Sequence, residues 1–293
     1  MRGEGMLGLE CCLVSHIGNK RSNHEDNFYL SDGIYLTLEE QSQMSQSSEK
    51  YIAYNEKYVG TSQRIFAVSD GMGGHKGGEV ASYMVTKSLQ TFEEQLRQMP
   101  IESNKDKSEC IKLFQNHIMQ TNDMILKKAK KDDLISMGAT LSGLICLGKE
   151  AVIFNIGDSS TFLYDSGELT KLTKDNNEAQ LLIDMKMAEP TDYELLRKKR
   201  RLTKYFGLEK EYGLLTAQMT KPFELQGNKM FLICSDGLTD SLEQEEIKAI
   251  LSQQNENIYL TAKMLINRAL QEGENSRAGY DNTTLLLIRV INL

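Results

Sequence analysis

Four apolar segments of the sequence are bounded by an aspartate that has glycine or another small residue beside it. Asp70, Asp158 and Asp236 each follow such a segment, and Asp281 comes just before the apolar stretch at 283–291. Strand ends in a sheet converge in space more readily than random loop positions, so these carboxylates are expected to meet. Carboxylates grouped without matching cations repel one another and are costly to remove from water. Bound divalent cations would relieve that cost, whereas each Asp-Gly pair taken singly is also compatible with a plain turn.

The candidate ligands are all oxygen atoms, which favours hard cations. No set of histidines and cysteines accompanies the aspartates, so Mg²⁺ or Mn²⁺ is favoured over zinc. The glycine-rich stretch at 71–78 lacks the GxxxxGK[ST] spacing of a nucleotide-binding loop. Its glycines instead let the backbone approach a metal, with the carbonyl of Gly71 as a ligand.

A further polar segment, residues 19–27, adds Glu25 and Asp26 to the candidates and has Arg21 nearby. A guanidinium beside a metal cluster suits a phosphate, because it grips two phosphate oxygens while cations hold the others. A solvated turn with a surface ion pair is the alternative interpretation of this segment.

The composition argues against some classes of function. A net charge of −7 is unfavourable for a general binder of nucleic acid or anionic membranes, since both need a basic partner. No apolar run approaches the roughly 18–20 residues that span a bilayer, and residues 1–12 do not resemble a signal peptide. The 5 cysteines have no paired zinc spacing, so we expect reduced core thiols in a cytoplasmic protein.

Strand-like segments occur in runs interrupted by paired helical segments, which favours an α+β fold over a strictly alternating parallel sheet. The predicted helices are 78–99, 107–131, 177–200, 243–252 and 257–271. The predicted strands are 9–17, 27–38, 64–69, 216–220, 229–234 and 283–291, with a three-stranded meander in 139–172. The Ser- and Gln-rich residues 39–50 are expected as a loop, within an exposed insertion over 39–62. With no internal repeat, residues 1–293 are expected to form a single catalytic domain.

Seven motifs follow one another along the chain. They are R-S-N-H-E-D-N (21–27), F-A-V-S-D-G-M-G-G-H-K-G-G-E-V-A-S (66–82), M-G-A-T-L (137–141), N-I-G-D-S-S (155–160), L-T-K-D (172–175), C-S-D-G-L-T-D (234–240) and G-Y-D-N-T-T (279–284). This ordered series resembles that of the type 2C (PPM) metal-dependent protein phosphatases over nearly the whole chain. The resemblance implies a four-layer α–β–β–α sandwich, with two central antiparallel β-sheets flanked by helices.

The resemblance also implies two Mn²⁺ or Mg²⁺ ions at one edge of the sandwich. Asp70 would bridge the two ions, Asp236 and Asp281 would complete the first site, and the Gly71 carbonyl would serve the second. Asp158 matches the position that, together with Asp236, holds a third and weaker metal in bacterial relatives.

Other residues would act around these ions. The resemblance implies that Glu25 and Asp26 orient metal-bound waters, that Arg21 binds the substrate phosphate, and that Asn282 supports Asp281 by hydrogen bonding. The implied reaction is hydrolysis of phosphoserine or phosphothreonine by attack of a metal-bridging water. The implied partners are phosphorylated proteins, in a signalling circuit with a Ser/Thr kinase and its substrates.

Some residues depart from the family pattern, and they indicate which branch of the family the sequence resembles. Met72 stands where many eukaryotic members have a histidine, which points to the bacterial branch, and His75 is weighed as an acid against a loop position. Residues 176–208 occupy the place of the mobile flap that borders the active site. The basic run Arg197–Arg201 within it is either a solvated face or a surface that steers phosphorylated partners.

Two other functions compete with an active protein phosphatase. One is a pseudophosphatase that binds phosphoproteins, and the presence of Asp70, Asp236 and Asp281 counts against it. The other is a metal-dependent hydrolase of small phosphoesters, for which the sequence shows no nucleotide or sugar motif.

Overall fold

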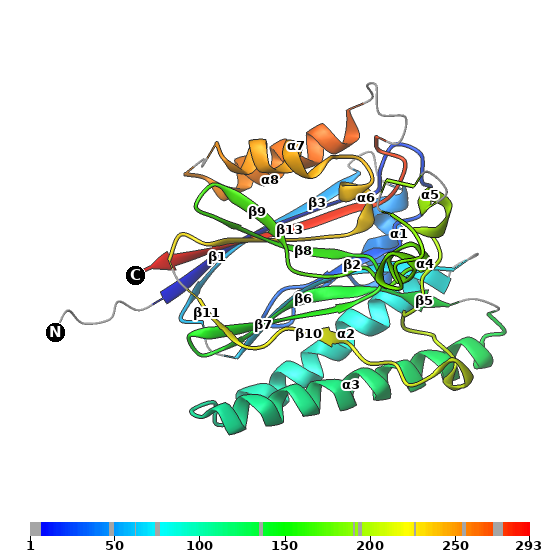
Figure 1. The fold of residues 1–293 in the computed structure, drawn as a ribbon, viewed down its shortest axis with the longest axis horizontal. Helices are drawn as coiled ribbons and strands as arrows, with labels where there is room; N and C mark the ends of the chain where they lie inside the picture. Colours follow the sequence, from blue (N-terminus) through cyan, green and yellow to red (C-terminus); the bar gives the residue numbers. More distant parts are fainter. Residues whose placement is uncertain are drawn as a thin grey trace.

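Two antiparallel sheets pack face to face in the centre of the molecule, and helices cover their outer faces (Figure 1). The computed structural model describes residues 7–46, 50–61, 63–73, 77–134, 137–189, 191–192, 195–225, 227–253, 256–271 and 278–293. The arrangement is the expected four-layer α–β–β–α sandwich, so the α+β fold class is confirmed.

The first sheet has the strand order β3-β1-β13-β12-β8-β9. The bounds are Tyr51–Val59 (β3), Leu7–His16 (β1), Thr283–Asn292 (β13), Met230–Cys234 (β12), Ser160–Asp165 (β8) and Glu168–Lys171 (β9). The first and last strands are neighbours, and they pair antiparallel from Leu7 opposite Asn292 to His16 opposite Thr283. Helices α7 (Gln244–Leu251) and α8 (Ile258–Leu270) cover the outer face of this sheet (Figure 1).

The second sheet has the order β10-β7-β6-β4-β2, with β11 paired to β7 and β5 paired to β4. The bounds are Gln218–Met219 (β10), Glu150–Ile156 (β7), Leu141–Leu147 (β6), Arg64–Met72 (β4), Asp26–Tyr29 (β2), Phe223–Glu224 (β11) and Gly138–Ala139 (β5). Helices α2 (Gly77–Arg97) and α3 (Asn104–Lys131) cover its outer face. The capping box between Ser103 and Asp106 fixes where α3 begins.

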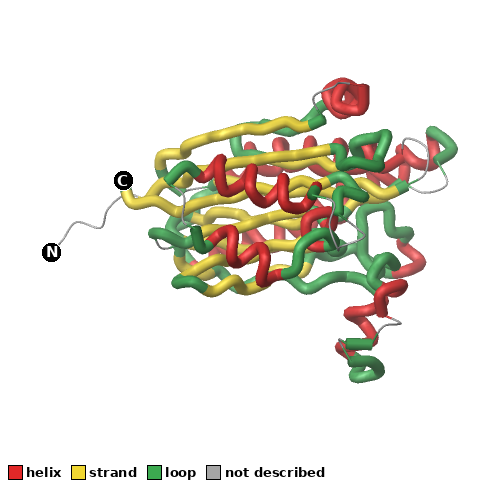
Figure 2. The backbone as a smooth tube through the Cα atoms, turned by 90° about the horizontal axis from the view of Figure 1, so that it is seen from above, coloured by secondary structure: helices red, strands yellow, loops and turns green. Residues whose placement is uncertain are grey.

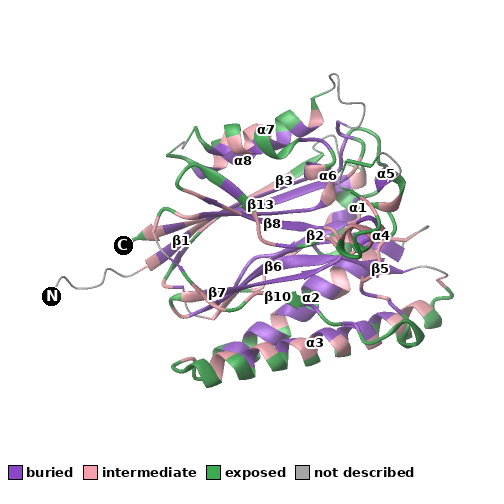
Figure 3. Cartoon of the chain, in the orientation of Figure 1, coloured by how far each residue is buried: buried purple, intermediate pink, exposed green. Residues whose placement is uncertain are grey.

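Alternation along the strands explains why both faces of each sheet are buried (Figure 3). In β13, Leu286 and Ile288 face the core between the sheets, whereas Leu285 and Leu287 pack toward α7 and α8. The almost continuous apolar run at 283–291 is thus buried on both sides, as its sequence predicts. The 5 cysteines of the chain are also all buried and unpaired, which confirms the expectation of core thiols.

The segment expected as a loop over 39–50 contains a helix, α1 (Leu38–Gln46), so that secondary-structure prediction is wrong. Thr37 and Glu40 cap one another at its start, and its residues Gln41 and Met44 are buried. The side-chain amide of Gln41 donates a hydrogen bond to the carbonyl of Asp26 at 3.0 Å. A Ser- and Gln-rich composition conceals this contact, because its stabilisation comes from tertiary packing rather than from helical periodicity.

The next part of the expected exposed insertion, 51–59, is the edge strand β3, which pairs with β1 over nine positions. Its Tyr58 is buried and donates a hydrogen bond to the Ser31 carbonyl at 3.0 Å. This part of 39–62 is therefore integral to the first sheet, and residues 47–49 and 62 lie outside the described residues.

Two other predicted elements are shorter than expected. The strand predicted over 27–38 ends at Tyr29, since Asp32 and Gly33 adopt positive φ and the chain turns there. The helix predicted over 177–200 is represented by α4 (Glu178–Asp184) and α5 (Leu195–Lys198), with a positive φ at Lys186 ending the first. No helix within the described ranges is both long enough and apolar enough to cross a bilayer.

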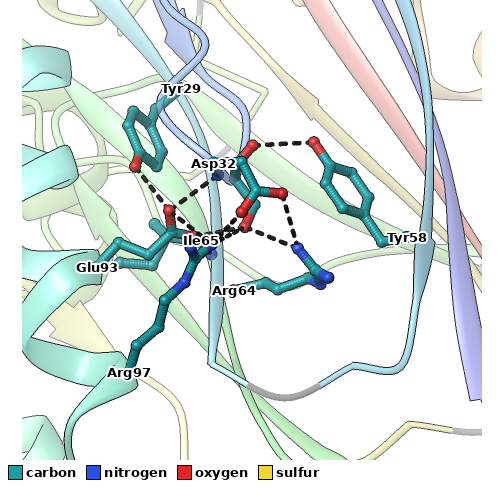
Figure 4. Close-up of polar contacts among 8 residues, drawn as sticks. Tyr29, Asp32, Tyr58, Arg64, Ile65, Glu93 and Arg97 are labelled. Atoms are coloured by element: carbon teal, nitrogen blue, oxygen red, sulfur yellow. Dashed lines mark hydrogen bonds and ion pairs between the residues drawn. The ribbon is translucent and has the colours of Figure 1, made fainter.

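A buried carboxylate, Glu93 of α2, connects this helix to the second sheet (Figure 4). It is 3% exposed and accepts hydrogen bonds from the Tyr29 hydroxyl (2.8 Å) and the backbone N–H of Ile65 (3.1 Å). Ser31 and the backbone N–H of Asp32 donate to it as well. Arg97 pairs with Glu93 at 3.3 Å, so the buried charge has a cationic partner.

Replacing Glu93 by alanine would leave these buried donors without an acceptor. We expect Glu93→Ala to lower the free energy of unfolding by about 3–5 kcal/mol, as for other broken buried pairs. Urea denaturation measures the change. The neighbouring Glu94 is exposed, so Glu94→Ala is the matched control and should change stability by less than about 0.5 kcal/mol. Equal effects of the two substitutions would contradict the assigned role of Glu93.

Candidate active site

The predicted aspartates lie at strand ends. These strand ends are on the opposite side of the sandwich from the start of β1 and the end of β13 (Figures 1 and 2). Asp26 begins β2 and Asp70 is near the end of β4, where the two residues are direct partners in the antiparallel pairing. Asp158 follows β7, Asp236 follows β12, and Asp281 precedes β13. The two sheets thus contribute carboxylates to one end of the molecule, as the sequence predicts.

A cavity of about 680 Å³ opens at this end. The predicted residues that line it are Arg21, Glu25, Asp70, Gly71, Asp158, Asp236 and Asp281. Asp26 and Asn282 are buried behind the cavity wall instead, with exposed fractions of 0% and 3%. These two side chains are therefore placed to support the lining residues.

Asp26 joins the two sheets through a short chain of hydrogen bonds. The Ser235 hydroxyl donates to Oδ2 of Asp26 at 2.8 Å, and the same hydroxyl oxygen accepts the backbone N–H of Thr284 at 3.0 Å. Oδ1 of Asp26 and Oδ1 of Asp236 are buried and have no hydrogen-bond partner among the described residues. Each of these two carboxylates therefore has an oxygen atom available for a ligand.

Thr140 positions the neighbouring aspartates. Its hydroxyl accepts the backbone N–H of Asp70 at 2.9 Å, and its own N–H donates to the Asp70 carbonyl at 2.8 Å. The Thr140 hydroxyl also lies 2.7 Å from that of Ser159, the residue after Asp158. Both sides of the cavity are thereby coupled through one buried threonine.

Gly71 occupies a position that has no room for a side chain. A Cβ atom there would lie 2.1 Å from the carbonyl oxygen of Gly78 and 2.6 Å from that of Glu25. The N–H of Gly71 donates to the same Glu25 carbonyl at 3.1 Å. Glycine is required because the start of α2 and the segment before β2 both approach the β4 backbone closely.

Asn282 holds the segment that carries Glu25. Its Oδ1 accepts the backbone N–H of Glu25 at 2.7 Å, and its amide nitrogen donates to the carbonyls of Ile17 and Asn23. The expected hydrogen bond to Asp281 is also present, and its donor is the backbone N–H of Asn282, which lies 2.9 Å from the Asp281 carboxylate.

Arg21 forms an ion pair with Asp281 at 2.7 Å on the cavity wall. Both side chains are partly exposed, at 48% and 37%, so water screens the pair and its contribution to stability is small. The guanidinium consequently reaches the cavity without being fixed in the core.

Burial and mutual repulsion make the charged state of this cluster unfavourable. Burial raises the pKa of Glu25 to about 7 despite the nearby Arg21. The pKa values of Asp70 and Asp158 are raised well above their usual range, first by burial and then by neighbouring aspartates. Burial likewise raises the pKa of Asp236, with Asp281 adding to the effect.

This cavity fits divalent cations. The described residues contain no finished cage of three or more acidic, histidine or cysteine side chains around one point. The carboxylates face a shared space instead, which suits Mg²⁺ because this ion retains several of its waters. The unpartnered oxygens of Asp26 and Asp236, together with the raised pKa values, are features that a bound cation relieves.

The segment expected as a flap, 176–208, reaches the cavity through Arg200 and Leu202. Its ends are held together by a hydrogen bond from the Thr203 N–H to the Asn176 carbonyl at 2.7 Å. Within the basic run, Arg201 pairs with Glu178 at 3.5 Å, whereas Arg200 lines the cavity. His75 lies outside the described residues.

Comparison with known proteins identifies the family. The profile of the family Protein phosphatase 2C matches residues 51–264. The chain belongs to the protein phosphatase 2C family. It is 31% identical to the serine/threonine phosphatase stp of Listeria welshimeri, over 77% of this chain and 84% of that protein. The expected resemblance is therefore confirmed.

The chain is also similar to a second family member, the serine/threonine protein phosphatase PstP of Mycobacterium tuberculosis. It is 29% identical over 82% of this chain, which spans 43% of the length of PstP.

Solved structures of the family share the fold. The catalytic domain of PstP in complex with 2 manganese ions is 26% identical, has a TM-score of 0.70, and is covered completely by 98% of this chain. Stp1 from Staphylococcus aureus has a TM-score of 0.73 at 23% identity, with 96% of this chain covering 94% of that one.

Several residues at the site were not assigned a role from the sequence. Asp240, Tyr280 and Lys20 line the cavity, and Thr140 and Ser159 connect its aspartates. Asp240 ends the motif at 234–240, and Thr140 belongs to the motif at 137–141. Their positions in these motifs could have marked both residues as part of the site. Their contacts, however, depend on how the two sheets pack against each other.

Asn282 provides a test of how the site is positioned. Asn282→Asp replaces the amide nitrogen by an oxygen that faces two backbone carbonyls. We expect it to lower the free energy of unfolding by about 2–3 kcal/mol and to weaken Mn²⁺ binding about tenfold or more. Chemical denaturation and calorimetric titration measure the two changes. Asn23→Asp, the same substitution at an exposed position, should have little effect on stability.

The raised pKa of Asp236 predicts an unusual dependence of stability on pH. Its folded-state pKa of about 7 lies above the unfolded value of about 4. The protonated form is therefore stabilised at low pH, and this stabilisation is lost as pH rises from about 4 to about 7. Without metal, Asp236→Asn should gain stability relative to the wild type over this range, on the order of 4 kcal/mol.

The stabilities of the wild type and Asp236→Asn are also compared with metal bound. Saturating Mn²⁺ should stabilise the wild type increasingly as pH rises, because protons and the metal compete for the carboxylates. The variant should respond much less. A stability difference between the two metal-free proteins that does not change with pH would contradict the assigned pKa.

Proposed function

We propose that the chain is a metal-dependent protein phosphatase that hydrolyses phosphoserine and phosphothreonine. The observation that carries the proposal is one cavity lined by several carboxylates with raised pKa values and by Arg21. Membership of the protein phosphatase 2C family supports this reaction, as do the names of the similar bacterial proteins. We further propose that residues 1–293 act as a single catalytic domain.

Two Mn²⁺ or Mg²⁺ ions are proposed as the cofactor. Asp70, Asp236 and Asp281, with the Gly71 carbonyl, would hold them, and Asp158 with Asp236 would hold a third and weaker ion. The similarity to PstP, whose structure contains 2 manganese ions, supports this choice. When bound, such ions supply an activated water and neutralise the charge of the phosphoryl group.

The chain's own residues supply orientation and charge. Arg21 would bind the phosphate oxygens, and its raised pKa keeps the guanidinium charged, with the hydrogen bond to Asp281 as the main cause. Glu25 and Asp26 would orient waters, while Asn282 keeps the Glu25 backbone in place. Burial raises the pKa of Cys234 to about 12, so this thiol is protonated at neutral pH and is a poor nucleophile.

The proposed substrates are phosphorylated proteins, and the proposed setting is a cytoplasmic signalling circuit with a Ser/Thr kinase. The bacterial relatives, which are named as serine/threonine phosphatases, support phosphorylated proteins as the substrates. The net charge of −7 is consistent with a protein that does not depend on nucleic acid or membrane surfaces for its function.

Asp70 tests the proposal most directly. We expect the wild type to release phosphate from a phosphothreonine peptide and from an aryl phosphate only when Mn²⁺ is present. Asp70→Asn should lower kcat/KM by at least about a hundredfold on both, since metal-assisted charge stabilisation is worth several kcal/mol. Asp133→Asn is the matched control, because Asp133 is exposed and its positive φ suits asparagine.

The outcomes separate the competing functions. If the wild type turns over neither substrate, the proposed enzymatic function is contradicted and a pseudophosphatase is favoured. Turnover confined to the aryl phosphate would favour a hydrolase of small phosphoesters.

A further inference from the structure

A second hollow, of about 890 Å³, lies beside the catalytic cavity. It runs between the C-terminal part of α3 and the chain segment 202–212. Met72, Gly73 and Leu202 line both this hollow and the catalytic cavity, so the two spaces share one wall. We call it the flanking groove, and its lining continues away from the catalytic aspartates toward Lys130 and Tyr212.

We propose that the flanking groove binds the polypeptide next to the phosphorylated residue and selects an apolar side chain accompanied by an acidic one. The proposal rests on the proposed phosphatase function and names the substrate class of that site. A phosphorylated side chain held at Arg21 brings its neighbouring residues over the shared wall at Met72 and Gly73.

The groove has an apolar lining that the protein itself leaves partly uncovered. Leu134, Ala129 and Tyr205 are half-buried and pack against the core formed by α2, α3 and the second sheet. Tyr212 stands at the edge of the groove with 72% of its surface exposed. Apolar side chains with one open side next to a polar site are typical of ligand-binding grooves.

Charge distinguishes the groove from the adjoining cavity. Among the described residues, Lys130 and Lys210 line the groove together with a single carboxylate, Glu209, and Lys210 pairs with Asp123 at 3.1 Å. The catalytic cavity is lined by 6 carboxylates and 3 cationic side chains. An acidic residue next to the phosphorylated one is therefore attracted to Lys130 of the groove, which favours one direction of binding.

The walls of the groove are held in place before any partner binds. The Asn122 side chain of α3 donates to the Leu208 carbonyl at 2.9 Å and accepts the Gly207 N–H at 2.6 Å. Phe206 and Ala139 exchange two backbone hydrogen bonds, of 2.8 and 3.1 Å. A preformed groove loses little conformational freedom on binding, which favours selectivity for a side chain that fits.

Peptide kinetics test the proposal. A phosphothreonine is placed in a Gly/Ser background, with one leucine moved through the positions on either side and, in a second set, one glutamate added beside it. We expect one leucine position to raise kcat/KM about tenfold or more, the range for an apolar group in a fitted pocket. An aryl phosphate, which reaches only the catalytic cavity, reports the basal activity.

Two substitutions in the groove have matched controls elsewhere. Tyr212→Ala should abolish the leucine preference, and Lys130→Glu should abolish the glutamate preference, with turnover of the aryl phosphate unchanged. Tyr51→Ala, a partly exposed tyrosine on β3, and Lys127→Glu, an exposed lysine on α3, should preserve both preferences. Unchanged aryl phosphate turnover also establishes that the variants are folded.

The results that overturn the proposal are distinct from those that overturn the function. Wild-type turnover without any positional preference would overturn the groove alone. The groove proposal would also be overturned if both groove variants kept the positional preferences. A loss of activity that is equal for the peptides and the aryl phosphate would overturn it as well. Absence of turnover on every substrate would overturn the proposed function, and the groove proposal with it.

Discussion

Repulsion between carboxylates gathered in a partly buried cluster is the constraint on which this structure depends. Asp26 and Asp70 are direct partners on adjacent strands, and Asp158 and Asp236 are brought to the same place from elsewhere in the two sheets. Burial raises the pKa values of all four. A fold selected only for stability would place apolar or paired residues there, so the rest of the sandwich has to stabilise an arrangement that is locally unfavourable.

The sandwich does so by fixing the backbone around the cluster rather than by neutralising its charges. Asn282 links the segments before β2 and β13, and Thr140 links the end of β4 to the region after β7. Ser235 connects the two sheets through Asp26 and Thr284. These contacts are mostly to backbone atoms, which leaves carboxylate oxygens free to face the cavity. Glu93 also fixes backbone, at a greater distance from the cluster. It holds α2 in place, and the first turn of α2 approaches Gly71.

Most of the catalytic end could be predicted from the sequence, because it is encoded locally. Asp70 and Asp236 each come at the end of an apolar run of sequence, and such a carboxylate can be identified without knowing what packs nearby. Helix α1 could not be predicted in this way. Its Gln41 is buried because the amide reaches the Asp26 carbonyl, and that contact depends on a partner 15 residues away. The roles of Thr140 and Ser159 likewise depend on how the sheets meet.

The flanking groove is the feature least accessible to sequence reasoning, and this follows from how it is built. Its two walls are α3 and the segment 202–212. In the sequence, the apolar residues of each wall look like residues of the hydrophobic core. The hydrogen bonds of Asn122 to Gly207 and Leu208 and the ion pair of Asp123 with Lys210 bring those walls together. The proposed reaction constrains the aspartates, whereas the residues along this groove can change without altering the carboxylates that are proposed to bind metal. Chemistry and selectivity therefore belong to different parts of the chain, joined at Met72 and Gly73, and selectivity can vary while the catalytic cavity stays the same.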